Sequence, residues 1–170
     1  GSNMTDIKEW IKTLDPDMVS LVIPTYNRPL FLEQVMYSII SQINPPKYEC
    51  IIVDDGSGEV QSRLNYEVYE TYKNLGVDIK YIKLEENSGT VSIPRNIGIS
   101  HISSLFISPT DDDCLLEPNK LDGLFGAITD IYDDDNIVVP LAFGNRRESV
   151  KENGVIKSIK VVNCRHQDPY

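Results

Sequence analysis

The chain has little of several features that would place it in a familiar class of protein. It contains two histidines, one tryptophan and three cysteines among 170 residues. Cys50, Cys114 and Cys164 show no metal-ligand spacing, and an odd number of cysteines favours reduced thiols over a disulfide framework. There is no signal peptide and no apolar run of the ~18 residues that a membrane span needs. We therefore expect a cytoplasmic protein with no transmembrane segment in this chain.

Positive charge is also scarce. Sixteen Lys and Arg stand against 26 Asp and Glu, which gives a net charge of −10 and a pI near 4.6. This balance argues against a surface for nucleic acid or anionic membrane. An anionic nucleotide would have to bind through local arginines or a metal ion. The length and the 41% hydrophobic content fit one domain with a substantial core.

Domain boundaries follow from the termini. Gly1, Ser2 and Asn3 precede Met4 and resemble a cloning remnant, so they are left out of the fold. Residues 4–170 are interpreted as a single domain. Within it, no 20–50 residue repeat, low-complexity tract or linker stands out.

Apolar patterns predict strands that alternate with helices. The predicted strands are residues 19–23, 48–53, 79–84, 105–107 and 137–141. The predicted helices are residues 5–17, 30–43, 61–73, 90–100 and 118–132, with Pro94 in a first turn and Gly76 as a C-terminal cap. Asn153-Gly154 indicates a hairpin. This alternation predicts βαβ units and a largely parallel sheet between helical layers.

Three consecutive carboxylates, Asp111 to Asp113, follow the strand pattern at 105–107. Taken alone, such a triplet is more often a solvated acidic loop than a site. A second triplet, residues 133–135, precedes a predicted strand and so serves as a comparison. Ligands of open α/β sheets bind beyond the carboxyl ends of strands, where only the first triplet lies. Clustered carboxylates suit Mg²⁺ or Mn²⁺, which can in turn hold a diphosphate.

Other loops at strand ends carry groups that suit a nucleotide. Tyr26 could stack on a base, and Asp55 could accept a hydrogen bond from a base N–H. Strand alternation sends Asp54 and Asp55 to opposite faces, so we expect only one to meet a ligand. Arg95 offers a planar fork for a phosphate or for holding the acidic loop in place. Alternatively, Tyr26 is a core aromatic, Asp54 is a turn residue before Gly56, and Arg95 forms a surface ion pair.

Four segments together resemble the donor-binding part of family 2 glycosyltransferases with the GT-A fold. They are residues 19–28 (VSLVIPTYNR), 51–57 (IIVDDGS), 87–98 (NSGTVSIPRNIG) and 111–113 (DDD). The resemblance covers roughly residues 18–143. The segment from Asn87 to Asn96 is most similar to enzymes that attach N-acetylglucosamine to wall teichoic acid.

The resemblance implies a Rossmann-like three-layer fold and a role for each matching residue. Pro24, Tyr26 and Asp55 would line a uracil pocket, with Asn87 and Arg95 close to the base or ribose. In the acidic motif, Asp111 and Asp112 would contact the nucleotide. Asp113 and Asp111 would hold Mn²⁺ or Mg²⁺, with Asp113 favoured. Residues 108–110 depart from the family pattern before the first Asp, so the register within the triplet stays open by one residue.

The general base of the family has no clear counterpart. Glu148, Glu152 and Asp168 are the carboxylates available near the C-terminus, and none lies in a matching context. The expectation is therefore a fragment whose catalytic base lies beyond Tyr170. Such a piece is expected to bind its donor without turnover.

The predicted function is metal-dependent, inverting transfer of a sugar from a UDP-sugar to a glycan or polyol-phosphate polymer. This implies a role in cell wall or polysaccharide biosynthesis, and association with the inner face of the membrane only through parts outside this chain. Two alternatives remain open. One is a nucleotide-sugar-binding module without turnover. The other is a Mg²⁺-dependent phosphoryl-transfer or receiver domain that uses the acidic strand end at Asp54 and Asp55.

Overall fold

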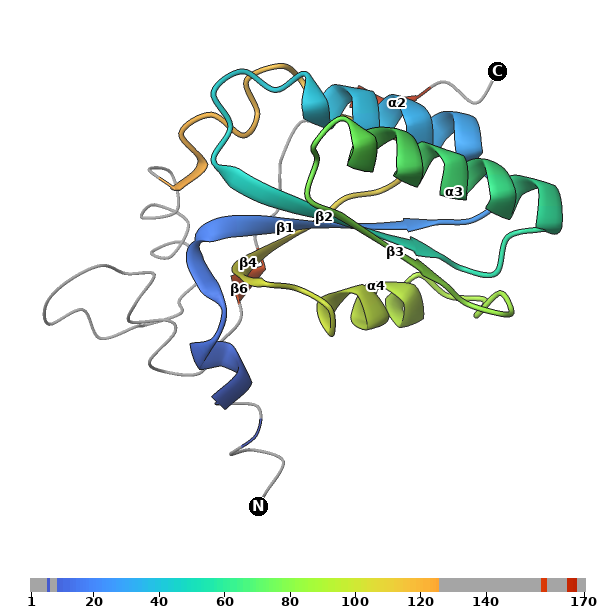
Figure 1. Cartoon of the computed structure of the whole chain (residues 1–170), viewed down its shortest axis with the longest axis horizontal. Helices are drawn as coiled ribbons and strands as arrows, with labels where there is room; N and C mark the ends of the chain where they lie inside the picture. The colour runs from blue at the N-terminus through green and yellow to red at the C-terminus, as the bar shows by residue number, and fades with distance from the viewer. Residues whose placement is uncertain (1–5, 7–8, 126–156, 159–164, 168–170) are drawn as a thin grey trace, which may run out of the picture.

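The computed structural model describes residue 6 and residues 9–125, 157–158 and 165–167. Its centre is a five-stranded sheet in the order β3-β2-β1-β4-β6 (Figure 1). The strands are β1 (Asp15–Thr25), β2 (Lys47–Asp54), β3 (Ile79–Lys83), β4 (Ser104–Pro109) and β6 (Lys157–Ser158). All pairings within this sheet are parallel, as the alternating pattern predicted. A separate antiparallel pair joins β5 (Cys114–Leu115) to β7 (Arg165–His166).

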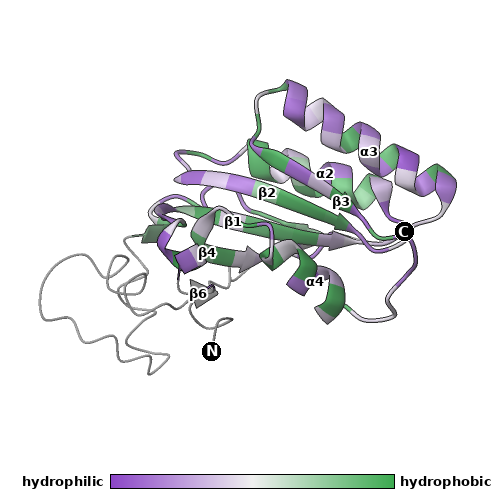
Figure 2. Ribbon diagram, turned by 60° about the horizontal axis from the view of Figure 1, so that its bottom comes forward, coloured by the Kyte–Doolittle hydropathy of each residue, from purple (hydrophilic) through white to green (hydrophobic). Residues whose placement is uncertain are grey.

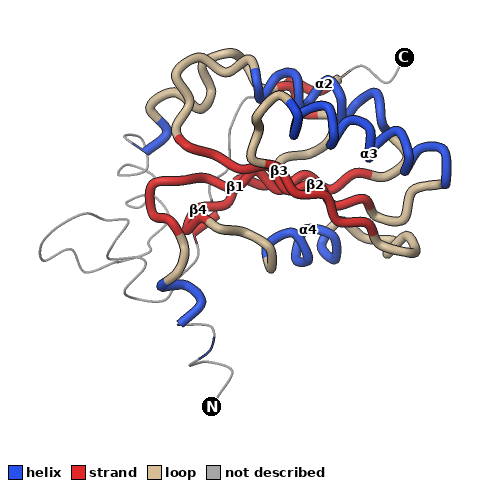
Figure 3. The backbone as a smooth tube through the Cα atoms, in the orientation of Figure 1, coloured by secondary structure: helices blue, strands red, loops and turns tan. Residues whose placement is uncertain are grey.

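Helices cover both faces of the sheet and make three layers. Helices α2 (Pro29–Ile40) and α3 (Glu59–Asn74) lie on one face, and α4 (Ser92–Ile99) lies on the other (Figures 1 and 3). The buried residues of α2 are Leu32, Val35, Met36 and Ile39, a helical spacing that places one apolar stripe against the sheet. The strands themselves are strongly apolar, while α3 carries polar residues on its outer side (Figure 2). The core therefore lies on both faces of β1, β2 and β4.

The strand order reverses direction beside β1. The chain runs outward from β1 through β2 to β3 and then crosses the opposite face through α4 to reach β4, on the other side of β1. Right-handed crossovers explain why α2 and α3 share one face and α4 takes the other. Such a reversal opens a crevice between the carboxyl ends of the two strands that flank it. Here those strands are β1 and β4.

Helix α4 packs unusually close to the sheet because of one glycine. A Cβ on Gly98 would lie 2.5 Å from Cγ1 of Val22 and 3.1 Å from Cγ2 of Val53. Any larger residue there would push α4 away from β1 and β2. Pro94 lies in the first turn of α4, as predicted, where its missing N–H is not needed.

Strand β1 is longer than predicted. We expected Pro24 to end it, but the strand continues to Thr25, with Pro24 opposite Val53 of β2. The pairing with β4 already ends at Val22, opposite Pro109. On that side, Pro24 therefore has no ladder hydrogen bond to lose.

Several predicted boundaries were wrong. The N-terminal helix, predicted to residue 17, has given way to β1 by Asp15, and α2 stops at Ile40, which leaves Ile43 60% exposed. Residues 118–123 form turns where a helix was predicted, because Gly123 has a φ of 69°. Residues 124 and 125 are helical, as predicted. Residues 126–132 of that helix, the strand at 137–141, the second Asp triplet and the Asn153-Gly154 hairpin lie outside the described residues.

The cysteines differ from one another. Cys50 is a free, buried core residue of β2, and burial raises the pKa of its thiol. Cys114 is disulfide-bonded, which corrects the expectation of reduced thiols throughout. Within the described part of the chain, no helix has the length and apolar character that crossing a membrane requires.

Candidate functional site

A cleft of about 510 Å³ lies where β1, β2 and β4 end, at the reversal of strand order. It is lined by Pro24, Thr25, Tyr26, Arg28, Asp55, Asn87, Gly89, Thr90, Val91, Pro94, Asp111, Asp112 and Asp113. Every candidate site residue from the sequence except Arg95 is in this lining. The structure therefore brings four separate loops into one pocket, as their positions at strand ends suggested.

The two aspartates that follow β2 face opposite ways, as predicted. Asp55 lines the cleft, whereas Asp54 is fully buried on the side of α3. Asp54 accepts hydrogen bonds from Ser57 N (2.9 Å), Asn65 Nδ2 (3.1 Å) and the Tyr81 hydroxyl (2.6 Å). Burial alone would raise the pKa of Asp54, but these hydrogen bonds outweigh it and lower the pKa. Asp54 is thus a structural anchor.

Asp55 is held from the loop that follows β3. Its carboxylate accepts hydrogen bonds from Asn87 Nδ2 (3.2 Å), Ser88 N (3.0 Å) and Ser88 Oγ (2.9 Å). The two loops can approach this closely because of Gly56, which has a φ of 71° and whose Cβ would lie 2.2 Å from the Asn87 nitrogen. These contacts fix the direction of Asp55 at the cleft wall and leave it able to accept a further hydrogen bond.

Tyr26 is a cleft residue and not a core aromatic, since 44% of it is exposed. The loop that carries it is tied down on its far side. Asn27, which has a φ of 54°, donates its backbone N–H to Ser57 Oγ (2.9 Å), and its side chain accepts from Gly58 N (2.8 Å). The turn after β1 is therefore built together with the turn after β2, and both hold their cleft side chains in place.

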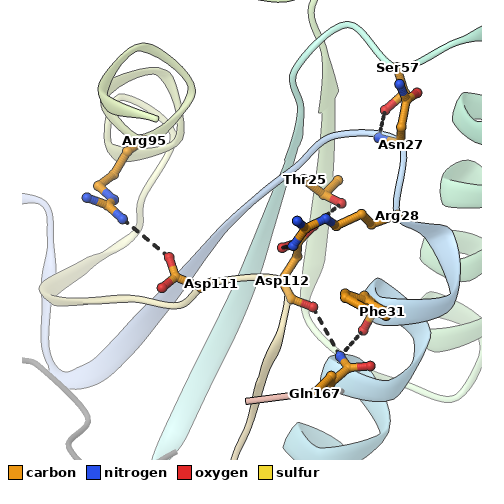
Figure 4. Close-up of polar contacts among 9 residues, drawn as sticks. All are labelled: Thr25, Asn27, Arg28, Phe31, Ser57, Arg95, Asp111, Asp112 and Gln167. Atoms are coloured by element: carbon orange, nitrogen blue, oxygen red, sulfur yellow. Dashed lines mark hydrogen bonds and ion pairs between the residues drawn. The ribbon is translucent and has the colours of Figure 1, made fainter. Parts of the chain in front are cut away.

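Residues 111–113, called here the acidic turn, are contacted by Arg95 from one side and by Arg28 from the other (Figure 4). Arg95 of α4 forms an ion pair with Asp111, with Nη2 and Oδ1 3.5 Å apart. The sequence left two uses for Arg95, a phosphate contact or a hold on the acidic loop, and the structure shows the second. The Asp111 side chain is 58% exposed, so this pair is close to solvent.

Asp112 is the buried member of the acidic turn. Thr25 donates a hydrogen bond to its Oδ2 (3.0 Å), and Arg28 Nη1 lies 3.5 Å from its Oδ1. Burial raises the pKa of Asp112, and Asp113 and Asp111 add to the rise, while Thr25 and Arg28 oppose it. Burial and two neighbouring carboxylates disfavour the charged form of Asp112, and a nearby cation would stabilise it.

Gln167, far along the chain from the acidic turn, hydrogen-bonds to the backbone of that turn. The side chain of Gln167 donates to the carbonyl oxygens of Phe31 (2.8 Å) and Asp112 (3.2 Å) (Figure 4). Its backbone N–H donates to Asp113 O (2.7 Å). Phe31 belongs to the first turn of α2. Gln167 therefore sets the spacing between the start of α2 and the acidic turn.

A divalent cation fits the chemistry of this donor set, although the described residues do not form a complete metal-binding group. Among the residues described, no three His, Cys, Asp or Glu side chains converge as metal ligands. Mg²⁺ sites of phosphate-handling proteins typically use one or two carboxylates, with waters and substrate phosphates as the other ligands. The acidic turn can supply one or two carboxylates to such a site.

Sequence reasoning missed four residues of the site. Thr25 and Arg28 lie within a loop that had been singled out, and their side chains could have been named from their position after β1. Ser88 lies inside the matching segment beside Asn87. Gln167 carried no signal, because nothing local in the sequence links it to residues more than 50 positions away.

The chain matches the model of glycosyl transferase family 2 over residues 20–160. The poly(ribitol-phosphate) beta-N-acetylglucosaminyltransferase TarP of Staphylococcus aureus is 33% identical over 108 residues, which cover 63% of this chain and 32% of TarP. The minor teichoic acid biosynthesis protein GgaA of Bacillus subtilis is 31% identical over 153 residues, covering 86% of this chain and 33% of GgaA. The matched part thus spans about a third of these two relatives.

Solved structures show the same fold. The crystal structure of S. aureus TarS matches with a TM-score of 0.59 and 26% identity, over 66% of this chain and 20% of that one. The structure of TarS 1-349 in complex with UDP-GlcNAc matches with a TM-score of 0.55 and 25% identity, over 69% of this chain and 31% of the TarS 1-349 chain. With this agreement of family model, relatives and GT-A fold, the chain belongs to glycosyl transferase family 2.

Proposed function

We propose that this chain binds a UDP-sugar and takes part in transferring the sugar to a glycan or a polyol-phosphate polymer. The observation that carries the proposal is the cleft at the strand-order reversal, where an exposed tyrosine, a fixed carboxylate and an acidic turn converge. The relatives add the chemical class. TarP is named as a poly(ribitol-phosphate) N-acetylglucosaminyltransferase, and TarS has been crystallised with UDP and with UDP-GlcNAc.

In this proposal the wall formed by Pro24, Tyr26, Asp55 and Asn87 holds the uracil base. Tyr26 offers an aromatic face for stacking, and Asp55 accepts the hydrogen bond of a ring N–H. The carboxylate is already aimed, because Asn87 and Ser88 hold it. A base placed there would therefore meet a preorganised acceptor, which lowers the entropic cost of binding.

The acidic turn faces the diphosphate end of the donor. Bound Mn²⁺ or Mg²⁺ would supply Lewis-acid stabilisation of the departing diphosphate. Asp113 and Asp111 stay the proposed metal-side carboxylates from the family pattern, and we propose Asp112, which is buried in the same turn and lines the cleft, as a third. Arg95 steadies Asp111 from α4, and Gln167 steadies the backbone of the turn.

The acceptor half of the reaction needs a base to remove the proton of the attacking hydroxyl. Glu148, Glu152 and Asp168 lie outside the described residues, so the proposal assigns this role to none of them. Single displacement with inversion at the anomeric carbon is the course that family membership favours. Residues 4–170 are proposed to act as one donor-binding domain.

The receiver or phosphoryl-transfer alternative is disfavoured by Asp54. That chemistry would use the acidic strand end as a pair, whereas Asp54 is buried and saturated by Ser57, Asn65 and Tyr81. No structural observation favours a binding module without turnover over an enzyme.

Calorimetric titration of UDP, ADP and NAD, each with Mn²⁺ and with EDTA, tests the proposal. We expect UDP to bind with Mn²⁺ and much more weakly in EDTA, because a polyanion and an acidic cleft repel each other without a cation. ADP and NAD should bind weakly in both conditions. Equal UDP affinity in metal and in chelator would refute metal dependence, and a preference for ADP or NAD would refute the proposed donor class.

A further inference from the structure

Arg28 is a cation that lines the cleft and pairs with a carboxylate of the acidic turn. Its Nη1 lies 3.5 Å from Oδ1 of Asp112, the carboxylate that is buried in the acidic turn. The Arg28 side chain itself is 51% exposed, whereas that of Asp112 is only 12% exposed. A half-exposed cation thus neutralises a largely buried anion.

The charges around the cleft do not balance even with this pair. The lining and its immediate support hold four carboxylates, Asp55 and the three of the acidic turn, against the two guanidinium groups of Arg28 and Arg95. The remaining excess of two negative charges matches one divalent cation. A metal ion that approaches Asp112 must therefore share that carboxylate with Arg28, and two cations at one carboxylate repel each other.

Arg28 also has a contact that would remain if its ion pair with Asp112 were broken. Its guanidinium lies over the Phe31 ring, 5.3 Å from the ring centroid, so it already has a contact that does not depend on Asp112. Arg28 lines the same cleft as Tyr26 and the acidic turn. A guanidinium forms strong two-point hydrogen bonds to phosphate oxygens.

We propose that Arg28 is an exchangeable counter-ion: it neutralises Asp112 in the empty cleft and moves to the donor's diphosphate when a divalent cation takes its place. This inference rests on the proposed function and adds a residue and a coupling that neither the family match nor the relatives' names assign. Its consequence is cooperativity. The metal alone binds weakly because Arg28 competes with it, and the nucleotide diphosphate removes that competitor.

The test uses Arg28→Gln and measures two affinities that should change in opposite directions. Mn²⁺ alone, followed by the electron paramagnetic resonance of the free ion, should bind at least about fivefold more tightly to the variant. That factor corresponds to the ~1 kcal/mol between unit charges 4 Å apart in water. UDP at saturating Mn²⁺ should bind about tenfold or more weakly, since charge-assisted hydrogen bonds to phosphate are lost. Uridine, which has no phosphate, should bind equally to both proteins.

Two further variants control for charge and for loop structure. Arg63→Gln removes the same charge from an exposed position on α3 and should change neither affinity. Arg28→Lys keeps the charge without the planar fork, so it should restore the wild-type affinity for Mn²⁺ alone and only part of the UDP affinity. If Arg28→Lys binds Mn²⁺ as tightly as Arg28→Gln, competition by charge is not the cause and the proposal fails.

The remaining outcomes separate this inference from the proposed function. Wild-type protein that binds no UDP would overturn the proposed function itself. Wild-type protein that binds UDP, combined with an Arg28→Gln variant of unchanged UDP affinity, would overturn only the counter-ion exchange. Equal losses for UDP and uridine would show that Arg28 merely shapes the loop, and would also overturn it.

Discussion

Two neighbouring polar regions at the end of β2 differ in how their carboxylates are used. On the α3 side, Asp54 is enclosed and accepts hydrogen bonds from Ser57, Asn65 and Tyr81. On the α4 side, Asp55 is also fixed, but it borders an open cleft. The residues are adjacent in sequence and identical in chemistry. The difference teaches that a carboxylate whose partners are all internal stabilises the fold, whereas one that is aimed but still accessible can bind a ligand.

The largest expected effect is a loss of stability when the enclosed carboxylate of Asp54 is removed. Asp54→Ala would remove the acceptor of two buried donors, Ser57 N and Asn65 Nδ2, and of the part-buried Tyr81 hydroxyl. An unsatisfied buried donor costs about 1–3 kcal/mol, so we expect a loss of about 3 kcal/mol or more in the free energy of unfolding. Asp55→Ala should cost much less, because Ser88 and Asn87 can turn to solvent. Urea denaturation of both variants checks this. Equal stability losses would show that the two regions do not differ in the way described.

The second effect concerns ligand binding and should fall on Asp55. Losing one charge-assisted hydrogen bond to the uracil N–H should weaken UDP binding by about 1.5–3 kcal/mol. Titration of UDP with Asp55→Ala at saturating Mn²⁺ measures this loss. Ser88→Ala is the matched control, since it removes a holder of Asp55 and not the acceptor itself, and should have a smaller effect. A normal UDP affinity for Asp55→Ala would remove this carboxylate from the site.

A third, smaller effect tests how the cleft is held. Gln167→Met keeps the bulk of the side chain but removes its hydrogen bonds to Phe31 O and Asp112 O. We expect about 1 kcal/mol less stability and weaker Mn²⁺-dependent UDP binding, because the acidic turn is no longer tied to α2. Uridine binding should stay unchanged, since the base wall does not involve Gln167. A variant in which uridine and UDP affinities fall together would mean that the whole cleft has been distorted.

The smallest expected effect is a pH dependence of the stability that Asp54 contributes. Because the pKa of Asp54 is lowered in the folded protein, its ionised form contributes stability above the unfolded-state pKa of about 4. That contribution is lost as the pH falls through the folded-state pKa. The stability difference between wild type and Asp54→Asn should therefore narrow from pH 6 to about pH 3. A constant difference would show that the hydrogen bonds do not favour the charged form of Asp54.

Local patterns were enough to select most of the candidate residues that line the cleft. Alternation of strand and helix patterns predicted the parallel sheet, and the opposite faces of Asp54 and Asp55 followed from the period of a β-strand. Boundaries were less predictable. Pro24 lies within β1 because of where its pairing with β4 ends, and residues 118–123 are turns despite their apolar spacing. The first outcome depends on a neighbouring strand, and the second on the left-handed conformation of Gly123, and apolar spacing reports neither.

By itself, the sequence determined which loops carry the candidate site residues, because turn residues and carboxylates follow the apolar strands. Only the tertiary structure decided how those loops meet. The reversal of strand order beside β1 brings the acidic turn across from Arg28, and Gln167 reaches it from 54 positions beyond Asp113 in the chain. The physical reason is that periodicity reports the burial of each segment against some core, while side-chain partners far apart in sequence are selected by packing in three dimensions.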